Sequence, residues 1–113
     1  MNGARKWFFP DGYIPSGRRG DLVSHESLCV LNAGEKEAHL TIKIFFENRD
    51  PIVFERTLKP QRDVHIRLEG IVPKETPYGV VLESDVPVVA QLSRLDVGPD
   101  HHTLMTSIGY WED

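Results

Sequence analysis

The chain has 113 residues, of which 40% are hydrophobic and 27% charged, and its formal net charge at pH 7 is −4. This length and composition are typical of one soluble globular domain, so we expect a single domain over residues 1–113 and exclude a disordered chain. A net negative charge supplies no concentrated basic surface, which argues against nucleic acid as a partner.

The N-terminal segment MNGARKWFF is basic but lacks the apolar run of a signal peptide. No window of the chain approaches the roughly 18 apolar residues that a membrane-spanning helix needs. The single cysteine, Cys29, has no intramolecular disulfide partner, and its context SLCVL is typical of a small buried residue. We therefore expect a protein of the reducing cytoplasm.

Residues 6–15, KWFFPDGYIP, combine four aromatic residues with two prolines and an Asp-Gly pair. This pattern predicts two short extended pieces joined at a turn. Trp7 and Tyr13 have two interpretations: anchors of a core or interface, which we favour, or the aromatic wall of a pocket for a ring or a sugar. Residues 16–23, SGRRGDLV, predict a surface loop.

Two strands are predicted next, joined by a turn at residues 32–35. In the first, residues 25–32, apolar side chains fall on both faces, so we expect cover on both sides, with a subunit contact as one candidate. The second, residues 38–46, alternates strictly and sends Leu40, Ile42, Ile44 and Phe46 inward. Phe45 then lies on the polar face, and we expect it to cover an interface between subunits.

Residues 51–58, 62–69 and 78–84 predict three more strands, the last of which ends at a turn at Ser84 and Asp85. The closing segment, residues 103–111, predicts a final strand with Leu104, Thr106, Ile108 and Tyr110 on one side.

The segment VPVVAQLSRLD, residues 86–96, begins with β-branched residues and ends with polar groups on both faces. We expect a site where this strand ends, near Gln91, Arg94 and Asp96. Arg94 and Asp96 share a face, so a charge-assisted contact is expected if the strand end bends. The alternative interpretation is a structural ion pair on a strand that grades into solvent.

Eight runs of this kind, separated by short turns and without a helical period, predict an antiparallel all-β domain. A two-sheet β-sandwich is the expected arrangement, because both the sheet twist and the unpaired edges need managing.

The sequence contains no motif typical of a catalytic site or of a metal site. His101 and His102 are adjacent, so in a strand they point to opposite faces, and only adventitious zinc binding remains for them. No serine lies in a Gly-x-Ser-x-Gly elbow, and no glycine-rich phosphate loop follows a strand. We therefore expect no metal, no cofactor and no enzyme activity.

Four segments in order carry a family resemblance: GYIP at 12–15, SHESLCVLNAG at 24–34, VPVVAQLSRLD at 86–96 and MTSIGY at 105–110. Together they resemble the soluble sensory rhodopsin transducer family. The resemblance implies a small jelly-roll-like β-sandwich that assembles as a homotetramer. It also implies signal transduction, since at least one member acts as the cytoplasmic partner of a photoreceptor.

The positions that match the family form a candidate patch for ligand or partner binding. They are Trp7, Tyr13, His25, Glu26, Asn32, Gln91, Arg94 and Asp96. Our leading hypothesis is a non-enzymatic homo-oligomer that binds a small ligand or a membrane receptor and relays its state. The alternative is a carbohydrate- or small-metabolite-binding module, in which Trp7 or Tyr13 stacks on a ligand ring.

Overall fold

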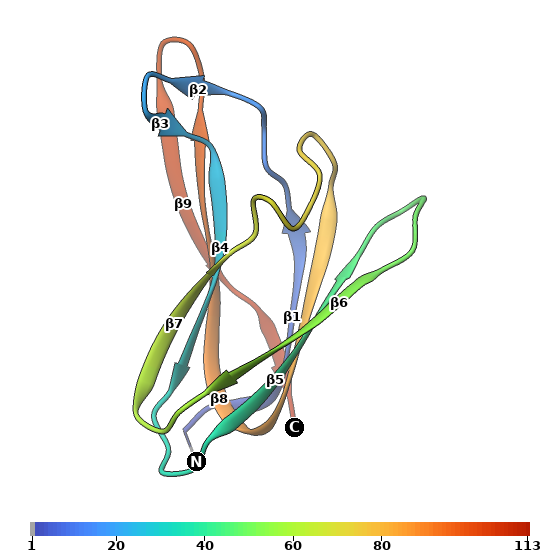
Figure 1. Ribbon diagram of the computed structural model, residues 1–113, viewed down its shortest axis with the longest axis vertical. Coiled ribbons are helices and arrows are strands. Elements are labelled where there is room, and N and C mark those ends of the chain that lie inside the picture. Colours follow the sequence, from blue (N-terminus) through green and yellow to red (C-terminus); the bar gives the residue numbers. More distant parts are fainter. Residues whose placement is uncertain (1) are drawn as a thin grey trace.

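The computed structural model describes residues 2–113, and over that range the chain forms ten strands and no helix (Figure 1). The all-β prediction is therefore confirmed, and every pairing between the strands is antiparallel. The strands are β1 (Ala4–Gly12), β2 (Arg18–Arg19), β3 (Leu22–Val23), β4 (His25–Asn32), β5 (Ala38–Phe45), β6 (Ile52–Leu58), β7 (Arg62–Arg67), β8 (Tyr78–Val97), β9 (His102–Ile108) and β10 (Tyr110–Glu112).

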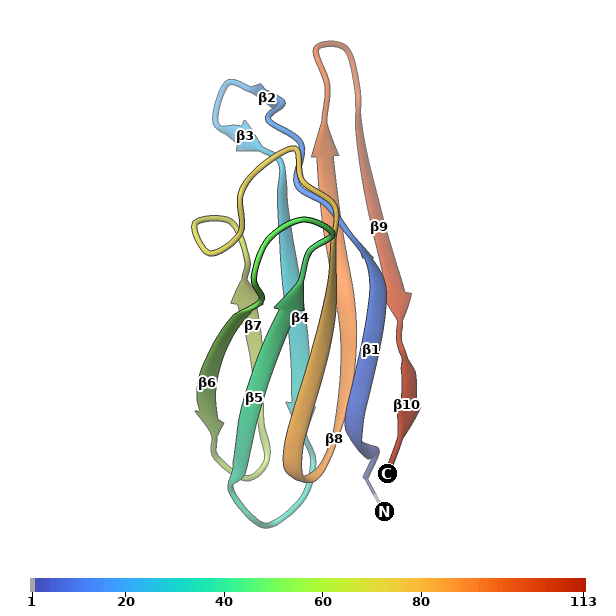
Figure 2. The same cartoon turned by 90° about the vertical axis from the view of Figure 1, so that its right-hand side faces the viewer.

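The 20-residue strand β8 belongs to both layers of the fold. Its first part pairs with β1 and β5, and its second part pairs with β4 and β9. Figure 2 shows β8 descending beside β5, bending sharply at the lower end and rising beside β4. The bend lies at residues 84–87, because the partners of Lys6 and Ala4 are Glu83 and Val88. The turn expected at Ser84 is thus a bend inside one strand.

The two layers form a sandwich, as predicted (Figures 1 and 2). Hydrogen-bonded neighbours in the first sheet run β10-β1-β8-β5-β6, and in the second they run β7-β4-β8-β9. The chain also crosses between the sheets at Gly109, between β9 and β10. A side chain there would clash, since a Cβ would lie 2.5 Å from the carbonyl oxygen of Phe8.

The core is built by the alternating residues that face between the sheets. In β5 these are Leu40, Ile42 and Ile44, all fully buried, as the sequence predicts. Val88 and Ala90 of β8 meet them from the opposite sheet within the same core cluster. Each large aliphatic side chain buried in this way stabilises the fold by about 1.5–3 kcal/mol.

Three expectations need correction. Residues 4–12 form one strand, not two pieces, and Pro10 is tolerated because it lies where the ladder with β8 shifts register, between Phe9 and Gly12. The loop at residues 16–23 contains the short hairpin of β2 and β3. The closing strand is divided into β9 and β10 because its two parts pair with different sheets.

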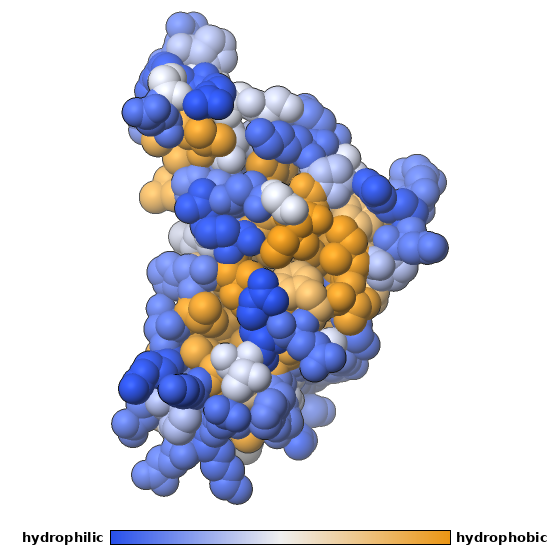
Figure 3. All heavy atoms as spheres, viewed as in Figure 1, coloured by the Kyte–Doolittle hydropathy of each residue, from blue (hydrophilic) through white to orange (hydrophobic). Residues whose placement is uncertain are grey.

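Apolar side chains also remain on the outer faces. Leu31 of β4 and Phe45 of β5 are 43% and 46% exposed, so a single chain does not provide the second cover expected for residues 25–32. On the face shown in Figure 3, hydrophobic surface gathers in the middle and hydrophilic residues lie at both ends. None of the described residues forms a helix long and apolar enough to cross a membrane.

Candidate functional site

A buried carboxyl group near the start of β4 contacts the segment that follows β1 and the first residue of β8. These strand ends lie at the upper end of the sandwich in Figure 1. Glu26 of β4 is only 2% exposed, and its Oε1 accepts hydrogen bonds from the backbone N–H of Tyr13, at 3.0 Å, and from the hydroxyl of Tyr78. The absence of a side chain at Gly12 makes room for Tyr78, since a Cβ there would lie 2.2 Å from its ring. The local sequence therefore seats Tyr78 against Glu26.

The protein environment shifts both partners toward their protonated forms. Burial raises the pKa of Glu26, and the hydrogen bonds from Tyr78 and Tyr13 oppose that effect only in part. Burial, followed by the hydrogen bond to Glu26, also raises the pKa of the Tyr78 hydroxyl. Tyr78 therefore remains a hydrogen-bond donor to Glu26 at neutral pH.

A second charged pair lies beside this carboxyl group. The Nε of Arg94 lies 3.2 Å from Oδ1 of Asp96, which is the contact that the sequence predicts. The guanidinium also lies 3.9 Å from Oδ1 of Asp11, and its Nη2 donates to the sulfur of Met105 at 3.5 Å. The Arg94 side chain is only 14% exposed, and its Nε and Oδ1 of Asp96 form a buried ion pair.

These groups line a cavity of about 90 Å³, which we call the upper pocket. One side is charged and comes from β1, β4 and β8; the other is a wall formed by β9. Its volume lies well below the roughly 300–1,000 Å³ of sites for drug-sized ligands, so only a small molecule or part of a molecule fits. The lining residues are Asp11, Glu26, Leu92, Arg94, Met105, Thr106 and Ser107.

Tyr13 is engaged by its own chain. Its hydroxyl donates to Oε1 of Glu75 at 2.8 Å, and the N–H of Ser16 donates to Oε2 at 2.6 Å. The first of these bonds makes the largest contribution to lowering the pKa of Glu75 and to raising that of Tyr13. The contact fixes the segment after β1 against the loop before β8, at the rim of the buried carboxyl site.

The structure brings together four of the eight predicted site residues: Tyr13, Glu26, Arg94 and Asp96. His25 lies at the same end, with its Nδ1 2.9 Å from the carbonyl oxygen of Val23.

Three others lie apart. The indole N–H of Trp7 donates to the carbonyl oxygens of Ala4, at 3.2 Å, and Val88, at 3.0 Å, so Trp7 belongs to the core. Gln91 is exposed on the outer face of the second sheet, with Nε2 3.5 Å from the Ser93 hydroxyl.

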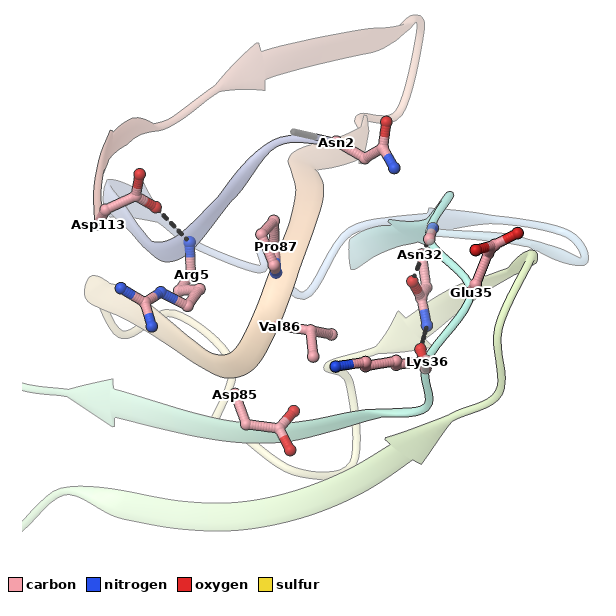
Figure 4. A pocket seen from close by; sticks show the side chains of 10 residues that line it. Asn2, Arg5, Asn32, Glu35, Lys36, Asp85, Val86, Pro87 and Asp113 are labelled. Atoms are coloured by element: carbon pink, nitrogen blue, oxygen red, sulfur yellow. Dashed lines mark hydrogen bonds between the residues drawn. The ribbon is translucent and has the colours of Figure 1, made fainter.

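Asn32 lies at the opposite end, beside a larger cavity of about 580 Å³ (Figure 4). Its Nδ2 donates to the carbonyl oxygens of Lys36, Leu58 and Lys59, at 2.9, 3.2 and 3.2 Å, and its Oδ1 accepts from Gly34. Because these backbone groups occupy its amide, Asn32 holds the turn between β4 and β5 in place.

Of the seven residues that line the upper pocket, the sequence indicated only Glu26 and Arg94 as site residues. Asp11 reads as part of a turn, and Tyr78, which donates to Glu26, opens an apolar strand and reads as a core residue; no local pattern marks either of them. Within residues 2–113 there is no group of three or more His, Cys, Asp or Glu side chains placed to hold a metal ion.

Fold and site together define a small antiparallel β-sandwich with a polar, charged pocket between its sheets. The chain belongs to the Anabaena sensory rhodopsin transducer (ASRT) family, which matches residues 2–111. This confirms the family resemblance found in the sequence.

Several solved structures are similar to the chain, and two of them illustrate the range of identity. The Thermotoga maritima protein 1070 is 59% identical with a TM-score of 0.95, over 99% of this chain and 97% of that one. The Anabaena sensory rhodopsin transducer is 33% identical with a TM-score of 0.73, over 85% of this chain and 92% of that one. No curated protein matches the chain significantly.

Proposed function

We propose that this chain is a non-enzymatic, oligomeric protein of the cytoplasm that binds a small polar ligand in the upper pocket and relays its presence to a partner protein. One observation carries the proposal. The side chains of Arg94, Glu26 and Asp11 line the same cavity, so a guanidinium and two carboxyl groups face one space of about 90 Å³. A ligand with polar groups would form hydrogen bonds to these charged side chains, and such bonds contribute about 1.5–3 kcal/mol each.

The chemistry of the lining favours a ligand with two kinds of group. A guanidinium recognises a carboxylate or another planar anion, so Arg94 would bind the anionic part. Carboxylates accept hydrogen bonds, so Glu26 and Asp11 would bind an amine or hydroxyl group. A small hydroxy acid or amino acid combines both features within the available volume.

The relay would run through β9. Met105, Thr106 and Ser107 line the upper pocket, while Leu104 and Ile108 of the same strand face solvent. A ligand that contacts the inner side of β9 more strongly in one arrangement shifts the population of that arrangement, and the outer side presents the change to a partner.

The name of the Anabaena relative links that protein to a sensory rhodopsin. For this chain we propose a membrane receptor as the partner, without assigning a photoreceptor.

A carbohydrate- or small-metabolite-binding module without a signalling partner is the second candidate. The polar lining supports it, but Trp7 is buried in the core, so its indole is not free to stack on a sugar ring as that hypothesis expected. The small volume likewise favours a compact metabolite over a carbohydrate. Fluorescence titration with a sugar panel separates the two ligand classes, since a carbohydrate module responds to sugars and not to hydroxy acids.

Thermal unfolding in the presence of a panel of small hydroxy acids and amino acids tests the proposal. We expect at least one compound to raise the Tm of the native protein, because a ligand that binds only the folded state stabilises it. Arg94→Gln should abolish that rise, whereas the control Arg67→Gln, on the outer edge strand β7, should retain it. No rise with any compound, or an equal rise in Arg94→Gln, would contradict ligand binding at this site.

A further inference from the structure

The cavity beside Asn32, which we call the lower pocket, lies at the end of the sandwich opposite the upper pocket (Figure 4). Its walls come from the start of the chain, the turn between β4 and β5, the bend of β8 and residue 113. Its volume of about 580 Å³ falls within the roughly 300–1,000 Å³ of sites for small organic ligands, whereas the upper pocket, at about 90 Å³, falls far below it. The two pockets therefore suit ligands of different size.

Hydrogen bonds hold the frame of the lower pocket in place. Nδ2 of Asn32 donates to the carbonyl oxygen of Lys36 at 2.9 Å, so the turn that presents Lys36 is fixed to the end of β4. At the bend of β8, Asp85 accepts hydrogen bonds from the backbone N–H and from Nδ1 of His39, at 2.8 and 2.7 Å. A frame that is already formed reduces the entropy lost when a ligand binds. This arrangement also gives a role to Asn32, which the upper pocket does not use.

Two cationic side chains of the lower pocket have no partner within residues 2–113. Neither the guanidinium of Arg5 nor the ammonium group of Lys36 forms an ion pair, a hydrogen bond or a contact with an aromatic ring, whereas the ammonium group of Lys43 lies 3.0 Å from a carboxylate oxygen. Figure 4 shows Arg5 and Lys36 on either side of the bend, whose partly buried Val86 and Pro87 supply apolar surface. Unpaired cations beside a concave surface attract an anion.

The carboxylates of the lower pocket are mostly engaged by the chain itself. Asp85 is bonded at the bend, and Oδ1 of Asp113 accepts a hydrogen bond from the backbone N–H of Arg5 at 3.3 Å. Of the three acidic residues in the lining, Glu35 alone forms no such bond within the described residues. The groups that remain for a ligand therefore carry two positive charges and one negative charge, which favours an anion.

We propose that the lower pocket binds a small organic anion: an oxyanion group that Arg5 and Lys36 hold, joined to an apolar body that rests on Val86 and Pro87. A guanidinium binds a carboxylate, sulfonate or phosphate through paired N–H donors, and an ammonium group adds a second, compact positive charge. The inference goes beyond the proposed function and does not rest on it, because the two pockets share no lining residue.

Fluorescence titration with 8-anilinonaphthalene-1-sulfonate tests the proposal. This probe joins one sulfonate to an apolar body of three aromatic rings, which is too large for the upper pocket. The double variant Arg5→Gln with Lys36→Gln should weaken its binding by about tenfold or more, because charge-assisted hydrogen bonds are lost. N-phenyl-1-naphthylamine, which has the same rings without the sulfonate, should bind the native chain and this variant equally well.

A matched control removes the same two kinds of charge elsewhere. Arg18 and Lys74 are exposed and lie outside the lining of the lower pocket, so Arg18→Gln with Lys74→Gln should bind the sulfonate like the native chain. Equal weakening in both double variants would overturn the proposal, because the probe would then respond only to net charge. Unchanged binding in Arg5→Gln with Lys36→Gln, or no fluorescence change with the native chain, would overturn it as well.

Amide chemical shifts of the native chain locate the probe without depending on any variant. We expect saturable shifts in the turn at residues 33–37 and in the bend at residues 84–87. Shifts confined to the exposed outer face around Phe45 would contradict the proposal, since the probe would then cover apolar surface without meeting the two cations. Arg94→Gln, which tests the upper pocket, should leave binding of the probe unchanged, so the two proposals can fail separately.

Discussion

The upper pocket and the C-terminal edge formed by β9 and β10 reverse the usual distribution of residues. The pocket buries charged and polar groups, with Glu26 and Arg94 both largely removed from solvent. In contrast, β9 exposes Leu104 and Ile108, and β10 exposes Trp111. Burying charges and exposing apolar surface both cost stability in an isolated chain. This contrast is the basis for the proposal that a polar ligand binds in the pocket, and the following experiments compare the two regions.

The largest expected difference comes from the same substitution made in each region. Leu92 lines the upper pocket and is 3% exposed, whereas Leu104 is 70% exposed on the neighbouring strand. Leu92→Ala should lower the free energy of unfolding by about 2–5 kcal/mol, because it leaves a cavity in the core. Leu104→Ala should change it by less than about 0.5 kcal/mol in dilute protein. Chemical denaturation measures both values, and equal losses would show that β9 is buried in the dilute state.

A smaller difference is expected for two tyrosines. Tyr78→Phe removes the hydroxyl that donates to Glu26, which leaves a buried carboxyl oxygen less well satisfied and costs about 1–3 kcal/mol. Tyr110 is 70% exposed on β10, so Tyr110→Phe should leave stability unchanged. Thermal unfolding of the two variants checks this. A neutral effect of Tyr78→Phe would mean that the hydroxyl bond has little net value.

Features that depend on local geometry could be predicted from the sequence. Period-two alternation places Leu40, Ile42 and Ile44 correctly, because one face of each strand is buried and the other is not. The pairing of Arg94 with Asp96 also followed, since the two residues share a face of a single strand. Contacts of this kind depend only on local geometry.

The remaining features depend on contacts between distant segments. Glu26 and Tyr78 are 52 residues apart, so no local pattern joins them. Trp7 lies in the core, as the favoured interpretation had it, whereas Asn32 was expected in a binding patch; the side-chain N–H groups of both donate to backbone carbonyls. The identity of a residue reveals that it needs a hydrogen bond; it does not reveal whether a ligand or the chain supplies it. For the same reason, the local sequence did not reveal that the two strands predicted on either side of Ser84 form one bent strand.

The pH dependence of stability should also distinguish the pocket, which contains a buried carboxyl group, from the exposed edge. The pKa of Glu26 is raised in the folded state, so the protonated form is favoured and stability falls as pH rises from about 4.5 through that raised pKa. The loss is about 1.4 kcal/mol for each unit by which the pKa is raised. Glu26→Gln cannot ionise, so the difference in stability between native and variant protein should change over this range. A difference that is independent of pH would show that Glu26 remains ionised on folding without cost.

The smallest effect is expected for an exposed titrating pair. His39 donates from Nδ1 to Asp85 at 2.7 Å, and this bond, helped by Glu37 and Glu55, raises the pKa of His39. Its contribution to stability is therefore present below about pH 6.5 and is lost as pH rises through the raised pKa. Because the pair is exposed to solvent, salt should reduce the effect. His39→Asn should remove that pH dependence, and a native protein with no slope between pH 6 and 8 would contradict it.

The membership of β8 in both sheets bears on how this family can vary in length. Deleting or inserting one residue in either half of β8 would reverse the inward and outward side chains of that half against two neighbouring strands at once. The hairpin tip at Gly20 and Asp21 has open space around it and carries no such constraint. Insertions and deletions among members of this family should therefore occur at such hairpin tips and not within the 20 residues of β8.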